Sequence, residues 1–160
     1  MEPNTAALRS RQWAPRSVQG LLSTNGVNVD PLDQWKQTPL HLAAFKGHHE
    51  VIKLSVCASG VNVNPIDQWK RTPLHLAALE GHLEVFKCSI STDGVNVNPL
   101  DQWKFTPLHL ASAGGRLNVI KILIATDGGN VNPTNDAQAT PLHIAILGRQ
   151  INVEYLCACP

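Results

Sequence analysis

The sequence has little cysteine, no excess of one charge and no long apolar run, and each shortage excludes a class of protein. Four cysteines in 160 residues are too few for a disulfide scaffold, so we expect reduced thiols and a cytoplasmic or nuclear location. No apolar stretch approaches the roughly 20 residues of a membrane-spanning helix. The N-terminal segment lacks the apolar core of a secretory signal, and its three arginines leave a transit peptide as the minor alternative.

Motifs for catalysis are also missing. The chain has no nucleophile elbow, no phosphate-binding loop and no cysteine pair with zinc spacing. Cys157 and Cys159 leave a C-terminal metal or redox site as a minor alternative. The formal net charge of +1 exerts no general attraction on nucleic acid or anionic membranes. The hydrophobic fraction of 43% allows a buried core, so we expect a folded protein. Because the motifs for catalysis are missing, we expect this protein to be non-enzymatic and to hold no metal or cofactor.

What the sequence does contain is a repeat of 34 residues. The tetrad Thr-Pro-Leu-His occurs at Thr38–His41, Thr72–His75, Thr106–His109 and Thr140–His143. The segment before the first three tetrads is nearly constant, reading GVNVDPLDQWK from Gly26, GVNVNPIDQWK from Gly60 and GVNVNPLDQWK from Gly94. A divergent copy, GNVNPTNDAQA, begins at Gly129. Repeats of this length indicate a stack of small units, because one unit cannot bury its own apolar face.

Each copy predicts two short helices and an extended hairpin. Threonine is a good N-cap and proline suits the first helical position, so the tetrad starts a helix. In the first copy this helix covers residues 39–46 and stops at Gly47. A second helix follows over residues 49–56, with equivalents at 83–90 and 117–124. Tetratricopeptide repeats have a similar period, but their aromatic pattern is missing here.

TPLHLAAFKGH at Thr38–His48 and TPLHLAALEGH at Thr72–His82 closely resemble the signature of ankyrin repeats. The resemblance covers roughly residues 26 to 157. It implies an all-α solenoid with short β-hairpin turns, whose usual role is to bind other proteins. We expect a degenerate N-terminal cap at residues 1–25 and then an array at 26–160 of about four units, near 26–59, 60–93, 94–127 and 128–160.

Two features depart from the family pattern. The period is one residue longer than usual, and the extra residue lies around Ala58-Ser59-Gly60. The turn of each hairpin also ends in lysine, at Lys36, Lys70 and Lys104, where the family usually has glycine. A left-handed lysine costs about 1 kcal/mol, which favours another shape for this turn.

A histidine recurs in every tetrad, which argues for a structural role. A metal or acid–base site would need several different side chains gathered at one place in the protein, whereas this histidine appears in each copy. The resemblance implies that it bonds the capping threonine and neighbouring backbone. The residues expected to act structurally in this way are Thr38, Pro39, His41, Thr72, Pro73, His75, Thr106, Pro107, His109, Thr140, Pro141 and His143.

Tryptophan is the most informative residue for function. Trp35, Trp69 and Trp103 occupy the hairpin turns, a position that ankyrin-like proteins commonly vary for ligand contact. Units stacked on the order of 10 Å apart would align the three indoles in a ladder, each followed by a lysine. Tryptophan is a favoured contact residue because it buries much area at little entropic cost. Alternatively, each indole covers core, with the lysine lying on its face.

Residues that vary between the copies are further candidates for partner contact, because the resemblance places them on the concave surface. These candidates are Gln37, Arg71, Phe105, Phe45, Lys46, Leu79 and Glu80. Gln34, beside Trp35 in the first turn, is a further candidate for partner contact. Apolar residues among these candidates suggest a partner-binding patch, or alternatively isolated surface positions.

We therefore expect a monomeric module that binds a protein or peptide. A binder of single-stranded nucleic acid is disfavoured, because Asp33, Asp67 and Asp101 offset the lysines; a fragment of a larger scaffold is the other alternative.

Overall fold

The structure, a computed structural model, describes residues 14–24, 26–58, 60–126 and 128–147. These residues contain eight α-helices and no β-strand. The helices are α2 (Ala14–Leu22), α3 (Pro39–Lys46), α4 (His49–Val56), α5 (Pro73–Glu80), α6 (Leu83–Ile90), α7 (Pro107–Ala113), α8 (Leu117–Ala125) and α9 (Pro141–Leu147). The predicted helix pair of the first copy, at 39–46 and 49–56, is confirmed.

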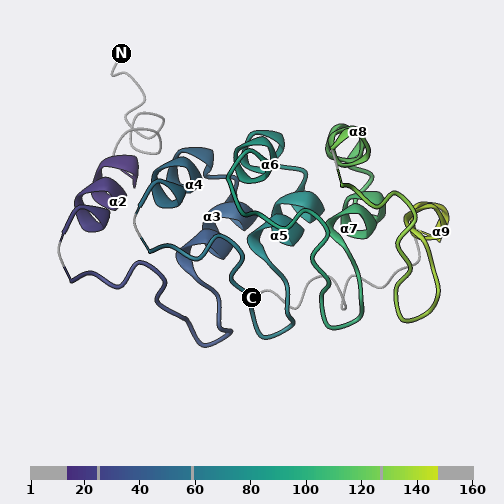
Figure 1. Cartoon of the computed structure of the whole chain (residues 1–160), viewed down its shortest axis with the longest axis horizontal. Coiled ribbons are helices and arrows are strands. Elements are labelled where there is room, and N and C mark those ends of the chain that lie inside the picture. Colours follow the sequence, from purple (N-terminus) through teal and green to yellow (C-terminus); the bar gives the residue numbers. More distant parts are fainter. Residues whose placement is uncertain (1–13, 25, 59, 127, 148–160) are drawn as a thin grey trace, which may run out of the picture.

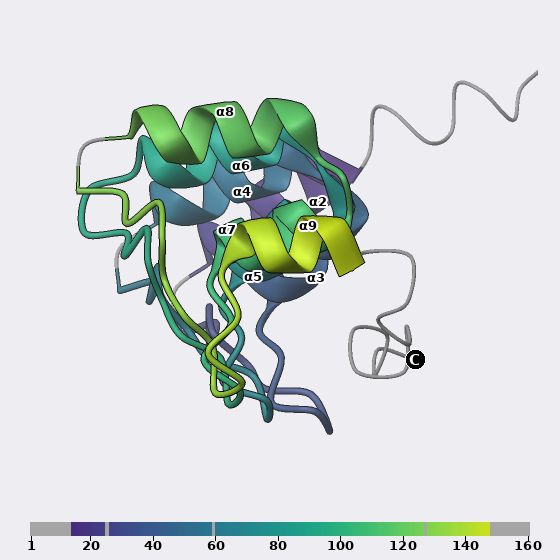
Figure 2. The same ribbon diagram turned by 90° about the vertical axis from the view of Figure 1, so that its right-hand side faces the viewer.

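The helices are stacked in two rows (Figure 1). In the first row α3, α5, α7 and α9 pack against one another, and α2, α4, α6 and α8 form the second row. Each long loop runs from the second row back to the first, and the loops project to the same side of the helices (Figure 2). We call each loop, with the helix or helices that follow it, a unit; the units begin at Gly26, Gly60, Gly94 and Gly128. The predicted all-helical repeat solenoid is confirmed.

The tetrad starts each helix of the first row through its capping residues. Thr38 has an extended backbone, with φ −88° and ψ 167°, and Pro39 follows in the first helical turn. His41 completes a capping box, because its ring accepts a hydrogen bond from the Thr38 N–H. Gly47 and Gly81 end α3 and α5 in the left-handed conformation, with φ of 77° and 78°.

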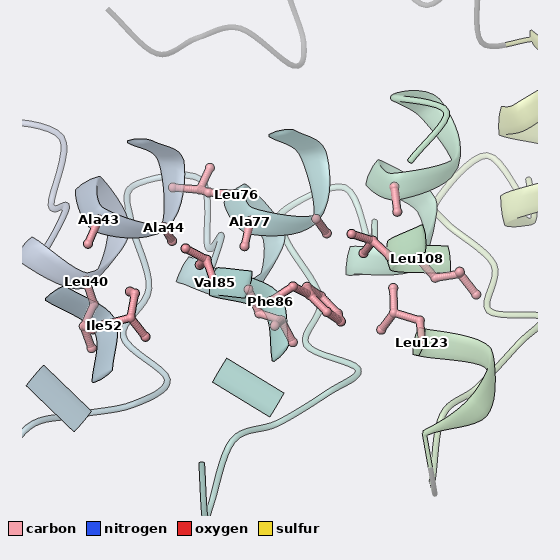
Figure 3. Packing of buried hydrophobic residues seen from close by; sticks show 14 residues of the cluster. Leu40, Ala43, Ala44, Ile52, Leu76, Ala77, Val85, Phe86, Leu108 and Leu123 are labelled. Carbon is pink, nitrogen blue, oxygen red and sulfur yellow. The ribbon is translucent and has the colours of Figure 1, made fainter. Parts of the chain in front are cut away.

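The core lies between the two rows (Figure 3). Small side chains of the first row, such as Ala44 and Ala77, are fully buried and let neighbouring helices approach closely. Larger side chains of the second row, such as Ile52 and Phe86, fill the space behind them. Complete burial of a side chain of this size contributes roughly 1.5–3 kcal/mol. These side chains belong to one continuous cluster, so the core runs along the array.

Basic side chains join consecutive units at the C-terminal ends of the first-row helices. The His82 ring lies over Gly47 and donates through Nε2 to the Phe45 carbonyl at 3.0 Å. One unit further on, Arg116 Nε donates to the Leu79 carbonyl at 2.9 Å. A donor at this position satisfies a helix carbonyl that has no partner within its own helix.

Asparagine side chains join the units along the loops. Asn64 Oδ1 accepts from the Asn96 N–H of the next unit at 2.8 Å, while Asn64 Nδ2 donates to the Gly94 carbonyl at 2.7 Å. The third unit repeats both bonds. The first unit has Asp30 at this position, and one of its carboxylate oxygens accepts from the Asn62 N–H at 2.8 Å. Its other oxygen, Oδ1, is buried and has no hydrogen-bond partner within the described part of the chain.

The N-terminal end of the first row is more exposed than its interior. Leu42 on α3 is 45% exposed, whereas the equivalent Leu76 and Leu110 are 0% and 2% exposed. Residues 1–13 of the expected N-terminal cap lie outside the described residues, as do Cys157 and Cys159. None of the helices that the structure describes is long and apolar enough to cross a membrane.

Candidate functional site

Each loop ends in a tight turn that its aspartate organises. In the first unit, Asp33 Oδ1 accepts from the backbone N–H groups of Trp35, at 2.9 Å, and Gln37, at 2.7 Å. Two backbone bonds close the same turn, from the Lys36 N–H to the Asp33 carbonyl and from the Asp33 N–H to the Gln37 carbonyl, both at 3.0 Å. The expected hairpins therefore take the form of tight turns, without β-strands in the described residues.

The turns hold a lysine in the left-handed conformation. Lys36, Lys70 and Lys104 have φ of 60°, 60° and 61°. The expectation that this turn avoids left-handed lysine was wrong. The aspartate carboxylate and the two closing backbone bonds offset a backbone cost of about 1 kcal/mol.

Consecutive turns are linked through the tryptophan backbone. The Gln68 N–H donates to the Trp35 carbonyl, and the Gln102 N–H donates to the Trp69 carbonyl, both at 3.0 Å. The Asp136 N–H makes the equivalent bond of 3.2 Å in the last described turn. The turn tips therefore form one connected edge of the array.

The three indoles are half-buried, so each is partly packed and partly open to solvent. The ring of Trp69 lies against the Arg71 guanidinium, whose central carbon is 4.3 Å from the ring centroid. Arg71 Nε also donates to Asp67 Oδ2 at 2.8 Å, and both partners of this ion pair are buried. The second turn thus holds its indole with an arginine, where the sequence suggested a lysine.

Two residues expected to contact a partner are buried. Gln37 is 4% exposed and Arg71 is 3% exposed. Gln37 closes the first turn with its backbone, and Arg71 is enclosed by its ion pair with Asp67 and its contact with Trp69. Neither side chain offers surface to a partner, and this expectation is corrected.

The remaining candidates fall into two groups. Gln34 is exposed at a turn tip, and Phe105 is half-buried beside the third turn, with its ring 5.4 Å from the His109 ring. The other group lies at the C-terminal ends of α3 and α5 and consists of Phe45, Lys46, Leu79 and Glu80. Each loop leads into the N-terminus of its helix, and eight helical residues span about 12 Å. The two groups therefore lie at opposite ends of these helices.

A ladder of exposed aliphatic residues at the turns was missed in the sequence. Leu32, Ile66 and Leu100 are 63%, 55% and 52% exposed. Their recurrence at the repeat period was visible, but the aliphatic residues of the core recur in the same way. We use the name tip row for these three residues with the tryptophans and lysines of the same turns: Leu32, Trp35, Lys36, Ile66, Trp69, Lys70, Leu100, Trp103 and Lys104.

The fourth turn has the same shape without any of the tip-row residue types. Asn135 Oδ1 accepts from the N–H groups of Ala137, at 3.0 Å, and Ala139, at 2.9 Å, as the aspartates do in the other turns. Gln138 takes the left-handed place of lysine, with φ 59°. Thr134 replaces the aliphatic residue and Ala137 the tryptophan. The turn therefore forms without the leucine, tryptophan and lysine of the tip row.

The tetrad histidines connect one unit to the next. His41 Nδ1 accepts from the Thr38 N–H at 3.1 Å, so Nε2 carries the proton and donates to the Arg71 carbonyl at 2.9 Å. His75 and His109 make the same pair of bonds in the following units. Burial lowers the pKa of all three histidines, and that of His75 to about 4, so the rings are neutral at pH 7.

The described residues contain no cluster of ligands for a metal. No three histidine, cysteine, aspartate or glutamate side chains in this part of the chain gather in a suitable arrangement. Burial raises the pKa of Asp101 to about 6, but the carboxylate is occupied by the N–H groups of Trp103 and Phe105. The raised pKa therefore follows from burial, and the two hydrogen bonds of the turn act in the opposite direction.

Comparison with known proteins agrees with the repeat architecture. The family model for ankyrin repeats, described as "Ankyrin repeats (3 copies)", matches residues 6–98 and 86–160. A search of curated proteins found no match.

Proposed function

Because the chain belongs to the ankyrin-repeat family, whose members generally mediate protein–protein interactions, we propose that it binds a partner protein through the tip row. The tip row offers one exposed aliphatic side chain, one half-buried indole and one exposed lysine in each of three consecutive turns. Aromatic residues held by a rigid scaffold lose little entropy when they bind, so such an edge suits recognition. Phe45, Lys46, Leu79 and Glu80 extend the proposed surface along the first row of helices.

The observation that carries this proposal is the fourth turn. A turn of the same geometry forms with Thr134, Ala137 and Gln138, so the turn itself does not require the tip-row residue types. Exposed aliphatic side chains and half-buried indoles cost solubility and are not needed to form the turn, and binding gives a reason for their presence. We also propose that the protein is monomeric and non-enzymatic, and that it acts in the cytoplasm or nucleus, either alone or as part of a larger scaffold.

The test compares proteins captured from cell lysate by the wild-type chain and by a Trp35→Ala, Trp69→Ala, Trp103→Ala variant. Ala137 shows that the turn accepts alanine, so we expect the variant to fold and to lose its partner. A control variant, Lys53→Ala with Lys121→Ala, changes exposed residues of α4 and α8 and should keep the same partner. Circular dichroism checks that all three proteins are folded. Capture of the same partner by a folded tryptophan variant would refute the proposal.

A further inference from the structure

We propose that the tip row binds an extended acidic peptide segment in the polyproline II conformation, with every third residue of the peptide meeting one turn. This inference rests on the proposed function and specifies the chemistry of the partner. Two observations carry it: the burial of the acidic residues beneath the lysines, and an ion pair already present at the edge of the row. The spacing expected for packed helices then selects the conformation of the peptide.

The spacing of the turns favours a peptide with three residues per turn. Each turn leads into one helix of the first row, and packed helices lie about 8–10 Å apart, so we take the same distance between neighbouring turn tips. A polyproline II segment has three residues per turn and advances about 9.3 Å in each turn. Its residues i, i+3 and i+6 therefore face three consecutive tips.

Other peptide conformations fit this edge less well. A β-strand presents the same face every second residue, about 6.7 Å apart, which does not match the spacing. An α-helix presents the same face every seventh residue, at about 10.5 Å, but helical ligands dock into grooves. The loops project as separate turns beyond the two rows of helices (Figure 1), so they form an edge for a narrow ligand.

The exposed charge of the tip row is positive. Lys36, Lys70 and Lys104 are exposed, whereas Asp67 and Asp101 are 3% and 5% exposed and bind the amides of their own turns. Within the described residues, Lys36 and Lys70 make no ion pair. Asp33 is half-buried and also binds the amides of its own turn. An acidic partner therefore meets the ammonium groups of Lys36 and Lys70 directly.

The last described turn already shows a carboxylate bound to the row. Asp136 of the fourth unit is exposed and contacts Lys104, with 2.9 Å between Oδ1 and Nζ. The backbone N–H of the same aspartate donates to the Trp103 carbonyl. An acidic residue of the peptide would meet Lys36 and Lys70 in the same way. Apolar residues of the peptide would cover Leu32, Ile66 and Leu100, which a nucleic-acid backbone would leave exposed to water.

The test measures fluorescence anisotropy of labelled peptides with the full chain. The probe is (Pro-Leu-Glu)3. Comparators are (Pro-Leu-Lys)3, a peptide of the same composition with glutamate at every second position, and a single-stranded oligothymidine of nine nucleotides. We expect the probe to bind at least tenfold more tightly than each comparator, and added salt to weaken its binding. The inference would be overturned if (Pro-Leu-Lys)3, or the peptide with glutamate at every second position, bound as tightly as (Pro-Leu-Glu)3. Tighter binding of the oligonucleotide than of (Pro-Leu-Glu)3 would also overturn it.

Lysine variants locate the binding on the tip row. We expect Lys36→Gln and Lys70→Gln each to raise the dissociation constant of (Pro-Leu-Glu)3 about threefold, as for an exposed ion pair. Lys53→Gln and Lys121→Gln, on exposed positions of α4 and α8, serve as matched controls and should leave binding unchanged. Equal effects of all four substitutions would contradict the assignment to the tip row.

An unbiased library of nine-residue peptides separates this inference from the proposed function. The library is selected on the wild-type chain, and the recovered peptides are tested on the triple tryptophan variant. Peptides that need the tryptophans and carry acidic residues three apart would support both claims. Peptides that need the tryptophans but lack this pattern would overturn the inference and leave the tip row as a binding surface. Recovery of no tryptophan-dependent peptide would overturn the inference, and the capture experiment would then decide the proposed function.

Discussion

Asp30 occupies, in the first unit, the loop position that Asn64 and Asn98 hold in the second and third units. Its carboxylate cannot donate the hydrogen bond that the asparagine amides donate to the next unit. Asn64 both accepts a bond from the next unit and donates to the Gly94 carbonyl, whereas Asp30 accepts one bond and leaves Oδ1 buried without a described partner. We expect Asp30→Asn to raise the free energy of unfolding by about 1 kcal/mol, because its amide can donate to the Gly60 carbonyl. Urea unfolding measures the change.

The reciprocal substitution is the control. Asn64→Asp removes the donor to Gly94 and should lower the free energy of unfolding by about 1 kcal/mol or more. If Asp30→Asn left stability unchanged while Asn64→Asp lowered it, Asp30 would already have a partner that compensates for the missing donor.

Buried histidines and Asp101 have opposite effects on stability in acid. The pKa of His75 is lowered to about 4, so the unfolded chain binds more protons below pH 6.5, and about 3 kcal/mol of stability is lost as the pH falls towards 4. The pKa of Asp101 is raised to about 6. The folded protein therefore binds the extra proton between about pH 4 and 6, and this group adds stability as the pH falls through that range.

Replacing Asp101 with asparagine should expose the effect of the histidines. Asn135 makes the same two turn bonds, so Asp101→Asn should keep the turn intact. We expect the variant to be more stable at pH 7 by about 1–3 kcal/mol and to lose stability more steeply between pH 6 and 4. Thermal unfolding across this pH range measures both effects. Parallel curves for the two proteins would show that Asp101 does not titrate in this range.

At the scale of the element, the contact between α3 and the next unit depends on Gly47, where both the backbone conformation and the space beside it favour glycine. Gly47 has φ 77°, and a Cβ at this position would lie 2.8 Å from Nδ1 of the His82 ring. We expect Gly47→Ala to lower the free energy of unfolding by about 2 kcal/mol, from backbone strain and displacement of that ring. Urea unfolding measures the change.

Gly94 provides the matched control for this substitution. Its φ is 80°, but no heavy atom lies within 4 Å of a Cβ built there. Gly94→Ala should therefore cost only the backbone strain, about 1 kcal/mol. Equal losses in the two variants would mean that the His82 ring moves aside without cost.

The helices were predictable from the sequence, but the exposure of the turn residues was not. Threonine and proline start the first helix and glycine ends it, and these signals act within a few residues. The burial of Arg71 depends on Asp67 and Trp69, and the exposure of Leu32 depends on where the loop lies relative to the helices. The left-handed Lys36 follows from bonds across the turn, which outweigh its local preference. Local signals therefore fix the elements, and tertiary contacts decide which side chains reach the surface.

At the scale of the whole molecule, equivalent positions differ in burial with their place in the array. Leu76 is fully buried between neighbouring units, whereas the equivalent Leu42 at the N-terminal end is 45% exposed. We expect Leu76→Ala to cost about 3 kcal/mol of stability and Leu42→Ala about 1 kcal/mol or less. Urea unfolding of both variants tests the difference. Equal losses would mean that Leu42 is covered in solution.

The bonds between units also determine how the array responds to a pulling force. His41, His75 and His109 each reach the carbonyl 30 residues ahead, and the turn tips bond in the same neighbour-to-neighbour manner. Tension along the array is therefore carried in series from one unit to the next, so we expect the units to unfold one at a time. Each released unit of 34 residues adds about 110–120 Å of contour length. The chain would lengthen in steps of this size, as an elastic tether that refolds when the load is removed.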